Sequence, residues 1–206
     1  VLWGGVAYAA LVFSHNGSAV QVSPLLLAFA LWSGRANLRH AIAYTSVAAI
    51  VGLLLSAFYW LPALAELSFA QIEEGYASTG IVYQNHFTPL HRLFTYPPVP
   101  VDSDMLNPPV SNPVAFLTLG LAIPALIIAL RSRSEILADL LCLSALALGC
   151  LFLVLPQSRM IWDGVPLLQR TLWPWRFVGP ASLFIALVAS GLVNCRLQGV
   201  GVGRQS

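Results

Sequence analysis

The sequence predicts an all-α protein, a polytopic bundle of transmembrane helices with long extracytoplasmic loops. Three observations lead to this fold class. Hydrophobic residues make up 58% of the 206 residues, and charged residues only 9%. The mean hydropathy is +0.78. The chain has 10 arginines and no lysine, and these arginines lie between long apolar runs. Since about a quarter of a soluble domain is charged, we expect lipid to cover this chain.

Apolar windows predict about six spans. These cover residues 1–13, 18–34, 40–61, 113–130, 135–155 and 177–195. Asn112 suits the N-cap of the fourth span and Pro113 its first turn, while Pro124 should kink it. Residues 1–198 then form one membrane domain, and residues 199–206 form a glycine-rich tail.

Small residues recur at every fourth position in two spans, which favours close helix packing in lipid. The two sets are Ala48, Gly52 and Ser56, and Ser182, Ala186 and Ser190. Because the chain opens at Val1 inside an apolar run, we interpret it as a fragment of a longer protein.

The arginines predict the orientation of the spans. Three short connections carry Arg35 and Arg39, Arg131 and Arg133, and Arg196 and Arg204. If these connections face the cytoplasm, the longer loops 62–112 and 156–176 face outward, as in a multi-pass protein of the bacterial inner membrane. The net charge of +2 is spread over several loops, so membrane lipid is the expected partner and nucleic acid is not.

Loop 62–112 is the first candidate for a site, because loops of this length are usually functional or disordered. His86, His91 and Arg92 could bind a phosphate or act in acid–base chemistry; the alternative is that they are surface residues at a lipid headgroup layer. Asp102 and Asp104 have a spacing that could share a divalent cation; a solvated turn is the alternative. No other cofactor is expected.

The segment before the last span is the second candidate. Arg176 stands at the N-terminal end of that span, where the helix dipole disfavours a cation. An anion is therefore its expected partner: a carboxylate, a lipid phosphate, or the phosphate of a lipid-linked substrate. Trp173 and Trp175 beside it could stack on sugar rings or lie among headgroups. His15, in a tight outer turn, is a third candidate that could line the same cavity.

These outer segments also carry a family resemblance. Its motifs are Ser14-His15-Asn16, the run from Tyr59 to Leu64, and Pro166-Leu167-Leu168 followed by Pro174-Trp175-Arg176-Phe177. They resemble the bacterial membrane proteins labelled "6-pyruvoyl-tetrahydropterin synthase related", which are similar to GT-C-type glycosyltransferases and to YfhO-like membrane proteins. The resemblance implies sugar transfer from a polyprenyl-phosphate donor on the outer face.

The resemblance implies a role for each candidate residue. Arg176 and Arg92 would hold the donor phosphate, Trp173 and Trp175 would pack on sugar or isoprenoid, and His15 and His91 would make polar contacts. The acidic motif of GT-C enzymes would lie upstream of Val1. Two alternatives remain: a transporter or flippase of lipid-linked precursors, and a non-catalytic scaffold subunit.

Overall fold

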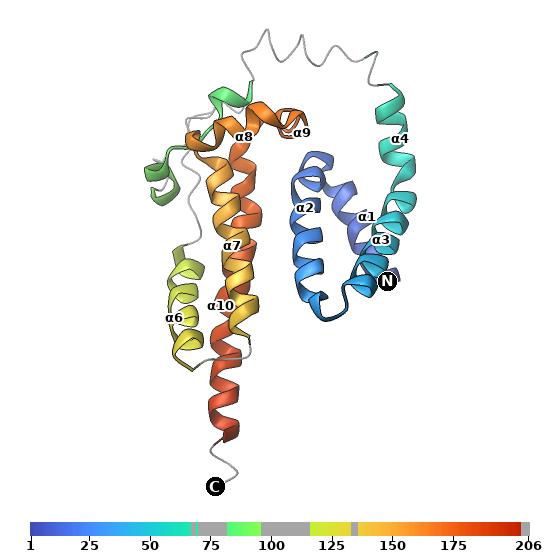
Figure 1. The fold of residues 1–206 in the computed structure, drawn as a ribbon. Coiled ribbons are helices and arrows are strands. Elements are labelled where there is room, and N and C mark those ends of the chain that lie inside the picture. The colour runs from blue at the N-terminus through green and yellow to red at the C-terminus, as the bar shows by residue number, and fades with distance from the viewer. Residues whose placement is uncertain (67–68, 70–81, 96–115, 133–135, 203–206) are drawn as a thin grey trace. The chain divides into compact units, whose positions relative to one another are not determined.

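A computed structural model describes residues 1–66, 69, 82–95, 116–132 and 136–202, and this part of the chain is all-helical (Figure 1). Each of the six apolar segments forms a helix. Three helical stretches are long and apolar enough to cross a membrane: Arg35–Leu55, Leu137–Val154 and Pro174–Val193. The apolar helices Leu2–Ser14, Gly17–Ser33 and Phe116–Arg131 are shorter. The proposed cap at Asn112 and Pro113 lies outside the described residues.

The chain divides into two compact units. Unit 1 comprises Val1–Asn85 and Pro166–Leu172, and unit 2 comprises His86–Val165 and Trp173–Ser206. Unit 1 contains α1 (Leu2–Ser14), α2 (Asn16–Ser33), η1 (Arg35–Asn37), α3 (Leu38–Leu55), α4 (Ala57–Ala65), η2 (Tyr83–Asn85) and α9 (Pro166–Gln169). Polar side chains set two of its helix starts: His15 Nδ1 accepts from the Ser18 N–H and Asn37 Oδ1 from the His40 N–H.

Helices α1 and α3 pack closely because glycines face each other between them. A Cβ atom added at Gly52 would lie 2.9 Å from the Gly5 carbonyl oxygen and 2.7 Å from Tyr8 Cδ1. A Cβ atom at Gly5 would lie 2.6 Å from Val51 Cγ1. The small residues of the third span therefore mark a real contact.

Replacing Gly52 with alanine should destabilise unit 1 by about 1–3 kcal/mol, because the new methyl group meets backbone that cannot move aside. The matched control is Gly149→Ala. Gly149 is also in an apolar helix, but nothing lies within 4 Å of the position its Cβ would take. Thermal unfolding in detergent compares the two variants. Equal melting temperatures would show that the α1–α3 contact is looser than described.

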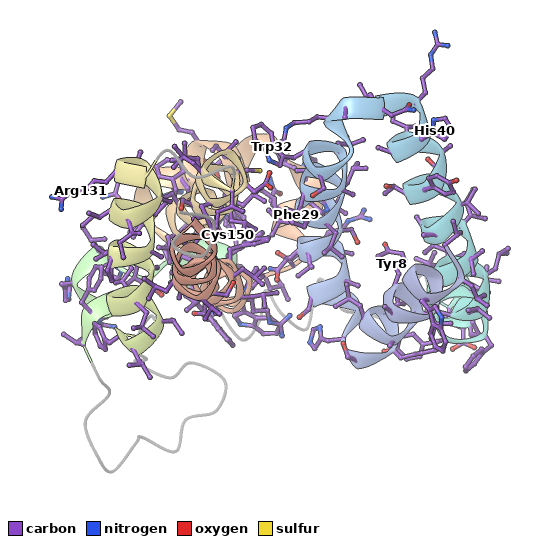
Figure 2. The ribbon with its side chains drawn as sticks, turned by 90° about the horizontal axis from the view of Figure 1, so that it is seen from below. Tyr8, Phe29, Trp32, His40, Arg131 and Cys150 are labelled. Carbon is purple, nitrogen blue, oxygen red and sulfur yellow. The ribbon has the colours of Figure 1, made fainter. Side chains whose placement is uncertain are left out.

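Unit 2 is built on three apolar helices: α6 (Phe116–Ser132), α7 (Leu137–Val154) and α10 (Val178–Val202). Helix α10 packs against both α6 and α7 (Figure 1). Ala125, Ala129 and Cys150 have no exposed surface, and Arg131 extends away from the group (Figure 2). The short elements η3 (Leu90–Phe94), η4 (Pro156–Ser158), α8 (Arg159–Gly164) and η5 (Pro174–Phe177) complete the unit.

Two helix boundaries and one helix face differ from the sequence prediction. The third span does not run unbroken to residue 61, since α3 ends at Leu55. Helix α10 continues to Val202, into the segment expected to be a tail. Between Val178 and Val193 of α10, the buried positions are Ala181, Phe184, Ile185, Val188 and Gly191, whereas in the expected ridge Ser182 and Ala186 are half-buried and Ser190 is exposed.

The same pair of residue types, a serine and a tryptophan, follows the ends of two apolar helices. After α3, Ser56 Oγ donates to the Gly52 carbonyl at 2.8 Å, and Trp60 Nε1 donates to the Leu53 carbonyl at 3.0 Å. After α7, Ser158 Oγ donates to the Leu155 carbonyl at 2.8 Å, and Trp162 Nε1 donates to the Leu153 carbonyl at 3.0 Å. Each indole N–H reaches a carbonyl near the helix end, where intrahelical donors run out, whereas each serine hydroxyl adds a second bond to a carbonyl that already accepts the N–H of the same serine.

Candidate functional site

Four aromatic and basic side chains meet where α10 begins in unit 2. Arg176 lies in η5, and its guanidinium carbon is 4.0 Å from the centre of the Trp173 ring and 5.9 Å from that of Trp175. His86 contacts the same Trp173 ring, with centroids 6.3 Å apart and the planes inclined at 62°. We call His86, Trp173, Trp175 and Arg176 the tryptophan–arginine cluster.

Arg176 is held in place by stacking. The contact with Trp173 is a cation–π interaction, which is strongest when both groups are partly withdrawn from water. The N–H donors of a guanidinium lie in one plane, a geometry that can bind phosphate or carboxylate in two places. The stack thus offsets part of the unfavourable helix dipole that Arg176 meets at the start of α10.

Packing around Trp162 positions His86. Phe87 contacts Trp162 edge-on at 5.9 Å, and Trp162 contacts Phe177 in the same way at 6.1 Å. The next residue, Thr88, donates its N–H to the Val154 carbonyl at 3.0 Å and is buried. The chain on the C-terminal side of His86 is therefore fixed to the end of α7.

The backbone before Trp173 is strained. Leu172 has φ 63°, in the left-handed region that side chains other than glycine rarely adopt. The turn is held by Thr171 Oγ1, which donates to the Leu168 carbonyl at 2.7 Å, and by the Leu172 N–H, which donates to the Gln169 carbonyl at 3.1 Å. Strain of this kind often accompanies functional sites, and here it directly precedes the cluster.

His86 carries a second unusual property. Its Nε2 atom is buried and makes no hydrogen bond within the part of the chain that the structure describes. Burial also lowers the pKa of His86 from its ordinary value of 6.5. The neutral ring is therefore favoured in the folded protein.

Acidification should loosen the part of unit 2 around His86. Because its pKa is lower in the folded state, the unfolded chain takes up a proton first as the pH falls below about 6.5, and stability declines from there until the folded pKa is reached. His86→Gln should remove this part of the pH dependence, whereas the exposed His40→Gln should not. Hydrogen exchange of residues 86–88 between about pH 7.5 and 5.5 measures this local stability. If His86→Gln and the unaltered protein have identical pH profiles, the prediction is contradicted.

The remaining candidates lie elsewhere. His91 and Arg92 are exposed on η3 of unit 2. His15 belongs to unit 1, where its ring caps α2. Asp102 and Asp104 lie outside the described residues, within which no group of three or more potential metal ligands occurs. Sequence reasoning grouped His86 with His91 and Arg92; no local pattern indicates its contact with Trp173.

Unit 1 contains polar groups within its apolar helices. The hydroxyl groups of Tyr8 and Ser23 are 2.8 Å apart and link α1 to α2. Gln21 is 2% exposed, and its Nε2 atom has no hydrogen-bond partner among the described residues. Such groups are costly in an apolar environment and make α2 the more polar of the two helices.

Comparison with known proteins adds no relative to this picture. No protein-family model matches the chain, and neither the curated proteins nor the solved structures include a significant match.

Proposed function

We propose that this chain is part of a polytopic inner-membrane glycosyltransferase of the GT-C kind, which transfers sugar from a polyprenyl-phosphate donor at the extracytoplasmic face. The observation that carries the proposal is the position of Arg176, stacked 4.0 Å from the Trp173 ring at the start of a long apolar helix. A rigid guanidinium at the membrane surface suits a phosphate whose lipid chain lies in the bilayer.

The six apolar helices cross or enter the bilayer in this proposal, with Arg35, Arg39 and Arg131 on the cytoplasmic side. The C-terminal end of α7 and the N-terminal end of α10 then lie at the outer surface, together with the tryptophan–arginine cluster. This arrangement follows the positive-inside rule.

The tryptophans supply the surface for the rest of the donor. Trp175 is 37% exposed, and Trp173 presents one ring to both Arg176 and His86. Sugar rings and isoprenoid chains both pack well on indole. The cluster contains a cation, a neutral imidazole and two indoles, and it does not require His15, His91 or Arg92.

Transport of a lipid-linked precursor is the rival function. Transporters place broken helices near the middle of the bilayer, so that helix ends face the substrate there. The two paired breaks of this chain follow α3 and α7, each of 18 residues. Such a helix is about 27 Å long, nearly the thickness of the hydrocarbon core. The breaks therefore fall at its surface, which favours a surface reaction over a central substrate site.

The test uses the full-length protein in liposomes with a radiolabelled polyprenyl-phosphate sugar and a mixture of membrane acceptors. We expect label to move from the donor to an acceptor. Movement of intact donor between leaflets without transfer would establish a transporter instead. If neither transfer nor movement of the donor is observed, a scaffold role remains and the proposal is overturned.

A further inference from the structure

The element η3 of unit 2 joins the ends of two apolar helices. Before it, Thr88 donates its N–H to the carbonyl of Val154, the last residue of α7. At its end, Phe94 contacts Phe116, the first residue of α6, with ring centroids 6.3 Å apart. Since α7 ends at Val154, η3 lies at the level of the C-terminal end of α7, beside the first described turn of α6.

The side chains of η3 divide into three kinds. Leu93 is 1% exposed and anchors the element in unit 2. Leu90 and Phe94 are 58% and 48% exposed, although both are apolar. His91 and Arg92 are exposed and basic. A soluble surface gains nothing from two large apolar side chains beside a cation, but the boundary between hydrocarbon and headgroups accommodates both.

The apolar surface of η3 continues onto the helix that it touches. Leu117, the residue after Phe116, is also strongly exposed at the start of α6. Since α7 is about long enough to cross the hydrocarbon core, the Val154 carbonyl marks the edge of that core. The residues fixed to it through Thr88 are at the depth of the lipid headgroups.

We propose that η3 is a membrane-surface anchor, in which Leu90 and Phe94 enter the acyl chains of the outer leaflet and Arg92 binds the phosphates of phospholipid headgroups. The partner is the lipid surface itself, and the proposal requires membrane insertion of unit 2 but not sugar transfer. Arg92 is then a lipid ligand rather than a second ligand of the donor phosphate.

Site-directed spin labels test the depth of η3 in phospholipid nanodiscs. The labels are placed at Leu90 and Phe94 after Cys142, Cys150 and Cys195 are replaced by alanine, and folding is checked by circular dichroism. Leu148, exposed in the middle of α7, gives the lipid reference, and the exposed Gln84 gives the water reference. We expect labels 90 and 94 to collide several-fold more with oxygen than with a nickel chelate, as at position 148.

Arg92 is tested in the same nanodiscs, with the label at position 90. Arg92→Glu should shift this label toward water, because a carboxylate repels the lipid phosphates, whereas Arg92→Lys should leave its depth unchanged. The anchor is overturned if labels 90 and 94 behave like the label at Gln84. It is also overturned if neither oxygen nor the nickel chelate reaches them. An unchanged depth in Arg92→Glu would overturn the phosphate contact. Neither readout depends on transfer activity, so failure of the anchor can be distinguished from failure of the proposed function.

Discussion

Arg176→Gln should lower the affinity for the proposed polyprenyl-phosphate donor by on the order of a hundredfold, or about 2–4 kcal/mol, and strongly reduce the proposed sugar transfer. The substitution removes the charge and the planar fork, both of which a bidentate phosphate contact uses. It also removes the cation from the Trp173 ring, 4.0 Å away. Donor binding is measured with a fluorescent polyprenyl phosphate in nanodiscs, and transfer with the radiolabelled donor.

Two further variants separate charge from geometry. Arg176→Lys keeps the charge but loses the flat stacking face and the fork, so we expect intermediate binding. Arg159→Gln is the matched control: Arg159 is exposed and lies 3.7 Å from Asp163, one turn along the same helix. Such surface pairs contribute little, so both binding and transfer should stay near those of the unaltered protein. Full donor affinity in Arg176→Gln would remove this residue from the site.

The positions of the helices were predictable from the sequence because they follow from the apolar composition of each segment. In lipid, a stretch of apolar residues must be helical to satisfy its own backbone groups, so hydropathy suffices to locate α3, α7 and α10. The faces of those helices were not predictable. From Val178 to Val193, helix α10 carries no charged residue and no polar stripe to mark its exposed side. Its small residues therefore suggested Ser182, Ala186 and Ser190, whereas Ala181 and Val188 are buried.

The candidate site was predictable only in part, for a different reason. Trp173, Trp175 and Arg176 are close in sequence, so their grouping could be read directly, and the structure brings them together. The contact of His86 with Trp173 depends on tertiary packing between distant segments. Likewise, the break at Ser56 lies inside an apolar run. The hydrogen bonds that accompany this break, from Ser56 and Trp60 to helix carbonyls, have no signature in hydropathy.

Trp162→Ala should be the most destabilising single substitution in unit 2, at about 3–5 kcal/mol, because it leaves a large cavity and removes one of the two hydrogen bonds to the Leu153 carbonyl. Trp162 has no exposed surface, lies edge-on between Phe87 and Phe177, and donates to the Leu153 carbonyl. Trp162→Phe keeps most of the packing and loses the hydrogen bond, so about 1–2 kcal/mol is expected.

The internal control is Trp60→Ala in unit 1. Trp60 makes the equivalent hydrogen bond, to the Leu53 carbonyl, but its side chain is not fully buried, so a smaller loss is expected. Thermal unfolding gives the overall effect, and hydrogen exchange at the Thr88 N–H gives the local one, since that group pairs with the Val154 carbonyl. If Trp162 positions His86 through Phe87, exchange at Thr88 rises in Trp162→Ala and not in Trp60→Ala. Equal exchange in both variants would mean that the end of α7 holds this segment without the indole, and that His86 is placed by Trp173 alone.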